Sequence, residues 1–173
     1  SASSMPTVDS GSVDVVFSGQ NLEHLWIDDM IGFFLEANRV LRPGGVLVVD
    51  SPNRLAVEAL GWTHGEHTIE MTADEAIQLL ETAGCEAGVV RGLWNCRDQA
   101  TGDWRELTAP AGDIAEVLDR SVGRRPVDDD FVWWIEAERM GAADPARLRS
   151  AVESLFARLW TERVNRAGER PGE

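Results

Sequence analysis

Residues 46–50 constrain the fold more than any other part of the sequence. The run Val-Leu-Val-Val-Asp follows Pro-Gly-Gly directly and ends at Ser-Pro-Asn. It shows no alternation of apolar and polar side chains, which is typical of a strand buried on both faces of a parallel sheet. Gly44 and Gly45 favour a tight turn before it. We therefore expect a central strand that delivers a polar corner to the carboxyl edge of the sheet, where open α/β sheets bind ligands.

Helix-like and strand-like segments alternate along the rest of the chain. Period-2 or β-branched runs predict strands at 13–17, 46–50, 86–95 and 131–138. Helical spacing of apolar residues predicts helices at 27–41, 72–82 and 145–164, with a short helical piece at 113–120. Thr72 and Glu75 have the spacing of a capping box at the start of the second helix. This order predicts an α/β domain with a mostly parallel sheet.

Composition and charge limit which binding partners and which cellular compartment we expect. The 173 residues fit one domain, and the formal net charge of −14 argues against nucleic acid and anionic membrane surfaces as partners. Cys85 and Cys96 have no metal-ligand spacing and fit two free thiols in a reducing cytoplasm. No apolar run approaches membrane-spanning length, and residues 1–7 lack the apolar core of a signal peptide. We therefore expect a cytoplasmic protein.

Four segments together resemble the second half of class I S-adenosylmethionine-dependent methyltransferases. They are VDVVFSGQNLEHL at 13–25, NRVLRPGGVLVVDSPN at 38–53, THGEHTIEMTADEAIQLLETAGCE at 63–86 and FVWWIEAERM at 131–140. The combination is specific, whereas Leu-x-Pro-Gly-Gly alone would be weak. The resemblance covers roughly residues 2–140. It implies part of a Rossmann-like fold, namely the second half of a seven-stranded sheet with an antiparallel last strand.

The resemblance also implies a domain organisation. The glycine-rich cofactor loop of the family, and the acidic residue that holds the ribose, belong upstream of these segments and are absent from this chain. Residues 1–140 are thus expected to form the C-terminal half of a methyltransferase domain, with 98–130 as an acceptor-side insert. Residues 141–173 are expected to form an amphipathic helix and a tail. An isolated half would expose 13–17 as a sheet edge, and open apolar edges invite pairing.

The cofactor implied by the resemblance is S-adenosylmethionine, with S-adenosylhomocysteine as its product. The residues expected at the methionine part of this cofactor leave the first strand at its carboxyl end: Ser18, Gly19 and Gln20. The residues that match the family's adenine-contacting segment are Ala2, Ser3 and Met5. An ordinary strand-to-helix loop remains the alternative interpretation of residues 18–20.

Two histidines are candidates for catalysis, because imidazole can accept a hydroxyl proton near neutral pH. His24 follows the first strand, and His67 lies in the loop WTHGEHT at 62–68. For His24, site-lining and purely structural roles stay open, and Glu23 is interpreted as a structural hydrogen-bonding group. The histidine spacing in the loop is not an established ligand spacing, so no metal is expected.

An acceptor site is expected beside these groups, since aromatic walls suit sugar rings and flat apolar molecules. The residues expected to line it are Trp26, Asn53, Trp62, His64 and Trp94. Core packing is the alternative for the tryptophans. Loop 62–70 looks most like loops of bacterial methyltransferases of polysaccharide or secondary metabolism, which is a fold-level analogy.

The resemblance, together with the absence of the cofactor loop from this chain, leads to two expected functions. The first is methyl transfer from S-adenosylmethionine to a small-molecule or saccharide hydroxyl, with a glycan or small molecule as partner. The alternative is a non-catalytic, methyltransferase-like module that pairs with another chain or domain. Pairing, including a homodimer, would use the open strand edge or helix 145–164.

Overall fold

The structure is a computed structural model that describes residues 3–109, 111–121 and 126–169. Its strands are β1 (Val13–Gly19), β2 (Leu41–Pro52), β3 (Cys85–Asn95) and β4 (Asp130–Arg139). Its α-helices are α1 (Ile27–Val40), α2 (Arg54–Ala59), α3 (Ala73–Thr82), α4 (Ile114–Arg120) and α5 (Pro145–Glu169). Two 3-10 turns complete the list, η1 (Leu22–His24) and η2 (Val127–Asp129).

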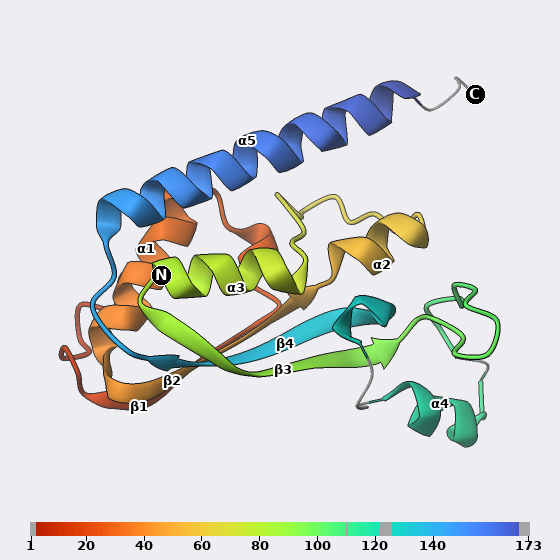
Figure 1. The fold of residues 1–173 in the computed structure, drawn as a ribbon, viewed down its shortest axis with the longest axis horizontal. Coiled ribbons are helices and arrows are strands. Elements are labelled where there is room, and N and C mark those ends of the chain that lie inside the picture. Colours follow the sequence, from red (N-terminus) through yellow and green to blue (C-terminus); the bar gives the residue numbers. More distant parts are fainter. Residues whose placement is uncertain (1–2, 110, 122–125, 170–173) are drawn as a thin grey trace.

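The four strands form one sheet in the order β1-β2-β4-β3 (Figure 1). β1 runs parallel to β2, and β4 runs antiparallel to both β2 and β3. The last strand in sequence is therefore antiparallel to its neighbours, as the resemblance predicts, and it is inserted between two earlier strands. β1, β2 and β3 point the same way, so their carboxyl ends share one edge of the sheet, where Gly19 pairs with Asp50.

Three helices, α1, α3 and α5, lie over the same face of the sheet (Figure 1). α5 packs against α1 and α3, and its apolar stripe is buried there. The stripe consists of Leu148, Val152, Leu155, Phe156 and Leu159. Trp160, expected on the same stripe, is instead 45% exposed. The face of α5 that could have paired with another chain is thus largely used within this one.

The expectation that residues 46–50 are buried on both faces of the sheet is wrong. Leu47 and Val49 are buried beneath the helices, whereas Val46 and Val48 on the other face are only partly covered. Their neighbours on β1 in that face are Val15 and Phe17, which are 56% and 61% exposed. Within the described residues, the helices over the strands lie on a single face, so the second apolar face stays open.

β1 forms an edge of the sheet, as expected for 13–17. On the open face of the sheet beside β1, the rings of Phe17 and Trp134 contact one another, with centroids 5.7 Å apart. A parallel edge strand with exposed apolar side chains offers unpaired backbone groups to another strand. This surface is therefore open to pairing.

The two cysteines are free and buried. Burial raises the pKa of the Cys85 thiol from 9.0 to about 11, against the opposing influence of the Arg139 charge, and burial also raises that of Cys96. Within the described residues, no helix has the length and apolar character that crossing a bilayer requires.

The raised thiol pKa predicts a loss of stability in alkali. An unfolded Cys85 ionises near pH 9.0, whereas the folded thiol keeps its proton to about pH 11, so stability is full below pH 9 and falls as the pH rises toward 11. The loss should reach roughly 2–3 kcal/mol. The chain has no tyrosine and no lysine, so few other side chains titrate in this window.

Urea unfolding at pH 8.5 and pH 10.5 measures this loss. Cys85→Ala should remove most of the pH dependence, and the Cys96 thiol should account for the remainder. A wild-type stability that does not change between the two pH values would contradict the assignment.

Candidate active site

The site begins where β1 and β2 end side by side. Gln20, which has a positive φ of 48°, turns its amide back onto Asp50. Its Nε2 and its backbone N–H both donate to Asp50 Oδ1, at 2.6 and 3.1 Å. Asn21 Nδ2 donates to the Ser18 hydroxyl at 3.1 Å. The two carboxyl ends are thereby tied into one polar corner.

Gly19 lies in this corner, and the side chains around it leave no room for a Cβ atom. A Cβ added at Gly19 would lie 2.9 Å from Asp50 Oδ2 and 2.9 Å from Phe17 Cζ. Neither contact is compatible with a side chain unless Asp50 or Phe17 moves. The glycine therefore allows Asp50 to approach the β1 backbone closely and complete the corner.

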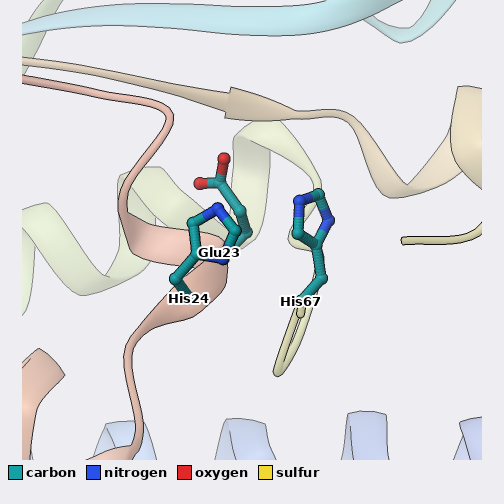
Figure 2. Close-up of side chains that lie close together, drawn as sticks. All are labelled: Glu23, His24 and His67. Carbon is teal, nitrogen blue, oxygen red and sulfur yellow. The ribbon is translucent and has the colours of Figure 1, made fainter. Parts of the chain in front are cut away.

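Three histidine rings gather next to this corner. His24 comes from η1, and His64 and His67 come from the loop between α2 and α3. The ring centroids of His24 and His67 are 4.8 Å apart, and those of His64 and His67 are 4.4 Å apart. Figure 2 shows the rings of His24 and His67 side by side, with the carboxylate of Glu23 next to them. The fold thus brings together residues from two segments that are distant in the sequence.

Hydrogen bonds determine the tautomer of two of these rings. His67 Nδ1 lies 3.0 Å from Glu70 Oε1, and His24 Nδ1 lies 3.2 Å from the Glu66 carbonyl oxygen. A carbonyl oxygen can only accept, and a carboxylate does the same, so we assign the proton of each neutral ring to Nδ1. Neither of these hydrogen bonds uses Nε2, so the lone pair of Nε2 stays available in both rings.

Glu23 is the buried acid of the site. Its side chain is 1% exposed, and Oε2 accepts a hydrogen bond of 2.8 Å from the Ser51 hydroxyl. Oε1 is buried and has no hydrogen-bond partner among the residues that the structure describes. A buried acceptor without a partner costs about 1–3 kcal/mol, and more when it is charged. Oε2 of Glu23 thus makes a structural hydrogen bond of the kind expected for this residue, whereas Oε1 makes none among the described residues.

Two contacts fix the loop that carries His64 and His67. The Thr68 backbone N–H and hydroxyl donate to the Glu23 carbonyl oxygen at 2.7 and 2.9 Å. From the other side, Arg163 of α5 donates to the carbonyl oxygen of His67 at 3.0 Å. The loop is consequently tied by hydrogen bonds to η1 on one side and to α5 on the other.

An aromatic wall borders the histidines. The Trp62 ring stacks on His64, with centroids 5.8 Å apart and an interplanar angle of 23°. Its centroid also lies 5.5 Å from that of His67 and 5.2 Å from that of Phe131, which meets it edge-on. Of the tryptophans proposed for the acceptor site, the structure places Trp62 among the histidines.

Other residues predicted for the site lie elsewhere or have other contacts. Trp26 is exposed and packs against Trp160 of α5, with ring centroids 6.0 Å apart. Trp94 donates from Nε1 to the Leu107 carbonyl oxygen, and the Arg120 guanidinium lies 4.6 Å from its ring centroid. Trp26 is thus joined to α5 and Trp94 to the insert, and their part in acceptor binding stays a prediction.

Asn53 is fully buried, and its amide serves the local fold. Oδ1 accepts from the Leu55 backbone N–H and caps α2, while Nδ2 donates to the carbonyl oxygens of Val127 and Asp130 at 3.0 and 3.1 Å. Among the groups assigned to adenine, Ser3 and Met5 are held against α1, through Asp29 and Glu36. Ala2 lies outside the described residues.

Sequence reasoning missed three contributors. Glu70 orients His67, Phe131 extends the aromatic wall, and Ser51 holds Glu23. The spacing His67-x-x-Glu70 was a visible signal, because residues three apart in a tight turn can meet. The Phe131 contact depends on how β4 inserts beside β2, and the Ser51–Glu23 contact depends on how η1 packs against β2. No local pattern specifies either arrangement.

Comparisons with known proteins agree with this fold. Residues 1–49 match the family described as "Methyltransferase domain". A probable S-adenosylmethionine-dependent methyltransferase of Mycolicibacterium smegmatis is 38% identical over 149 residues, which cover 83% of this chain and 56% of that protein. A second such protein, of Mycobacterium tuberculosis, is 42% identical over 86 residues, covering 49% of this chain and 31% of that one. The chain thus spans about half of the length of the first of these relatives and about a third of the length of the second.

Solved structures show the same fold at low sequence identity. A methyltransferase of Haloferax volcanii, solved in complex with the activator Trm112, gives a TM-score of 0.55 at 15% identity, covering 83% of this chain and 60% of that one. A methyltransferase of Archaeoglobus fulgidus gives 0.53 at 13% identity, covering 76% and 62%. In sequence the chain is similar to S-adenosylmethionine-dependent methyltransferases, and in fold to solved structures of such enzymes. Its sequence relatives include mycobacterial proteins.

Proposed function

We propose that this chain takes part in methyl transfer from S-adenosylmethionine to a hydroxyl group of a small molecule or saccharide. The single observation that carries the proposal is the pair of imidazoles, His24 and His67, whose Nε2 lone pairs are unused by their hydrogen bonds beside the carboxyl ends of β1 and β2. In open α/β sheets this edge is the place where ligands bind.

The residues at the β1–β2 corner fit one end of the cofactor. The methionine part carries an ammonium group, and the corner offers acceptors for it in Ser18 and in the buried Asp50 carboxylate. The glycine at position 19 keeps the backbone free of a side chain there. The bound cofactor would supply an electrophilic methyl group on a positively charged sulfur. The ribose and the glycine-rich loop contacts would come from outside this chain.

The reaction requires the acceptor oxygen to lose its proton as it attacks the methyl carbon. The new C–O bond forms as the C–S bond breaks, and the electron pair of the broken bond stays on sulfur. His67 is the better placed proton acceptor, because Glu70 holds its Nδ1–H and stabilises the imidazolium that results. His24 faces it across 4.8 Å and completes the polar wall of the acceptor site. Orientation between these walls supplies much of the rate enhancement.

The aromatic wall supports a flat or ring-shaped acceptor. Trp62, with Phe131 edge-on to it, presents an apolar surface next to the proton acceptors, and such surfaces suit the faces of sugar rings. His64, stacked on Trp62, borders the same wall and can donate or accept a hydrogen bond.

A second candidate function rests on the open edge of β1. The exposed side chains of Val15 and Phe17 favour a non-catalytic or shared role in which another chain, a second copy or a further domain completes the sheet. The Haloferax volcanii neighbour was solved with an activator protein, so a partner is compatible with this fold. Here the partner would bring the missing strands and the cofactor loop.

Labelled methyl transfer tests the main proposal. The protein that carries this chain is incubated with methyl-labelled S-adenosylmethionine and a panel of saccharides and small phenols or alcohols. Label recovered as an O-methyl ether, identified by NMR of the product, is expected. Label on nitrogen or carbon would overturn the hydroxyl assignment, and no transfer by a folded, cofactor-binding protein would favour the non-catalytic module.

A further inference from the structure

We propose that Glu23, His24 and His67 form a binding site for a divalent transition-metal cation of the Zn²⁺ class. Each residue offers one ligand atom, and these atoms all lie within 4.8 Å of one another. The three side chains come from two separate segments, η1 and the loop after α2, and converge on one point (Figure 2). Spacing within the histidine-containing loop did not predict a metal, because two of the three ligands, Glu23 and His24, come from η1.

The unpartnered oxygen of Glu23 is the first argument. Glu23 is almost fully buried, and Oε1 has no hydrogen-bond partner in the described part of the chain, although Ser51 satisfies Oε2. A carboxylate oxygen buried without a donor is normally neutralised by a cation or bound to a metal. Two imidazoles beside it offer lone pairs rather than positive charge when neutral, so they add ligands to the same point.

The hydrogen bonds of the two rings are the second argument. Metal-bound histidines almost always donate their other N–H to a carboxylate or a backbone carbonyl, which fixes the tautomer and the ring orientation. His67 has this arrangement with Glu70 at 3.0 Å, and His24 has it with the Glu66 carbonyl oxygen at 3.2 Å. Both rings are therefore oriented so that Nε2 serves as the ligand.

The donor set selects the class of metal. Two imidazoles and one carboxylate are the ligands of many catalytic zinc sites, which keep a fourth position for water or substrate. Mg²⁺ and Ca²⁺ prefer oxygen ligands and would not gain from the imidazoles. Ligand atoms bound at 2.0–2.2 Å in a tetrahedron lie about 3.3–3.6 Å apart, so closing the site requires side-chain movements of about 1 Å.

Cation binding and the proposed proton transfer use the same Nε2 lone pairs, so both cannot occur in one molecule at once. With a cation bound, the imidazole could no longer accept the hydroxyl proton, and the cation would instead lower the pKa of an acceptor hydroxyl bound at its open position. The binding measurement below uses neither cofactor nor acceptor. Failure of the methyl-transfer assay and failure of the metal site are thus distinguishable.

The test is a zinc titration of the protein after removal of metals by chelation, in competition with a chromogenic chelator. One Zn²⁺ per chain is expected, and an excess of Mg²⁺ or Ca²⁺ should not displace it. Glu23→Gln and His67→Gln should each weaken binding by more than about 100-fold, since each removes a ligand. Glu70→Gln should weaken it by about 10–100-fold through loss of ring orientation.

The three histidines of the chain provide the matched control. His64 lies outside the three-residue group, so His64→Gln should leave zinc affinity within about threefold of wild type. His24→Asn changes a partly exposed ring with little risk to folding, and X-ray absorption of its zinc complex should show one imidazole where wild type shows two. No binding to a folded protein, or equal loss in all three histidine variants, would overturn the proposal.

Discussion

Replacing Trp133 by alanine is expected to lower the free energy of unfolding by about 3–5 kcal/mol, the range for large aromatic-to-alanine changes in a core. Trp133 is completely buried under the helices, in the central strand β4. Its Nε1 also donates to the Met71 carbonyl oxygen at 2.9 Å, so alanine would leave a cavity and an unsatisfied acceptor. Urea unfolding followed by circular dichroism measures the change.

Trp134 is the matched control, because it is the next residue on the same strand and faces the opposite side of the sheet. It is partly exposed, and its Nε1 donates to Glu136 in its own strand. Trp134→Ala should therefore cost no more than about 1.5 kcal/mol. Equal losses for the two variants would contradict the one-sided packing of helices described for this sheet.

Substituting glutamine for His67 is expected to lower kcat for methyl transfer by about 10²–10⁴-fold, the usual contribution of a general base. Glutamine can keep a hydrogen bond to Glu70 but cannot accept the hydroxyl proton. The KM for S-adenosylmethionine should stay within about twofold, because we propose His67 for the acceptor side of the site. Initial-rate kinetics of wild type and variant measure both constants.

His64→Gln controls for general damage to the loop. His64 stacks on Trp62 and lacks the carboxylate partner that His67 has, so its loss should reduce kcat by less than about tenfold. An undiminished kcat in His67→Gln, or an equal fall in both variants, would remove His67 from the role of proton acceptor.

Local patterns predicted the elements of this chain well. The capping box of Thr72 and Glu75 is present with both of its hydrogen bonds, at 3.3 and 2.8 Å, and α3 begins where they place it. The strand from 46 to 50 is the middle of β2, and 86–95 and 131–138 are β3 and β4 within one or two residues. These signals are local, which is why the sequence alone reveals them.

The features that were missed depend on long-range packing. The absence of alternation in 46–50 indicated burial on both faces, yet one face of the described sheet stays open beside Phe17. Helix α2 is only six residues long, which is too short to show a helical period. The position of Glu23 beside His67 arises from Thr68 bonding across to η1, a contact between residues 45 apart in the chain.

The sequence identified many residues of the candidate site, but it did not predict how they are arranged in space. His24, His64, His67 and Trp62 were all predicted, and the structure brings their rings together. Trp26 and Trp94 lay equally close to strand or helix ends in sequence, but one meets α5 and the other the insert. Which aromatic residue turns toward the histidines is set by loop conformation, for which the sequence carries no periodic signal.

The most direct test of the central claim is a titration of the ¹⁵N-labelled chain with S-adenosylhomocysteine, followed by two-dimensional NMR. The account predicts chemical-shift changes centred on Ser18, Gly19, Gln20 and Asp50. A low affinity does not affect this prediction, because the titration is carried to saturating ligand. Gln20→Ala, which removes a hydrogen bond to Asp50, should reduce these changes. A folded chain whose spectrum does not change at saturating ligand, or changes only far from the β1–β2 corner, would contradict a cofactor site there.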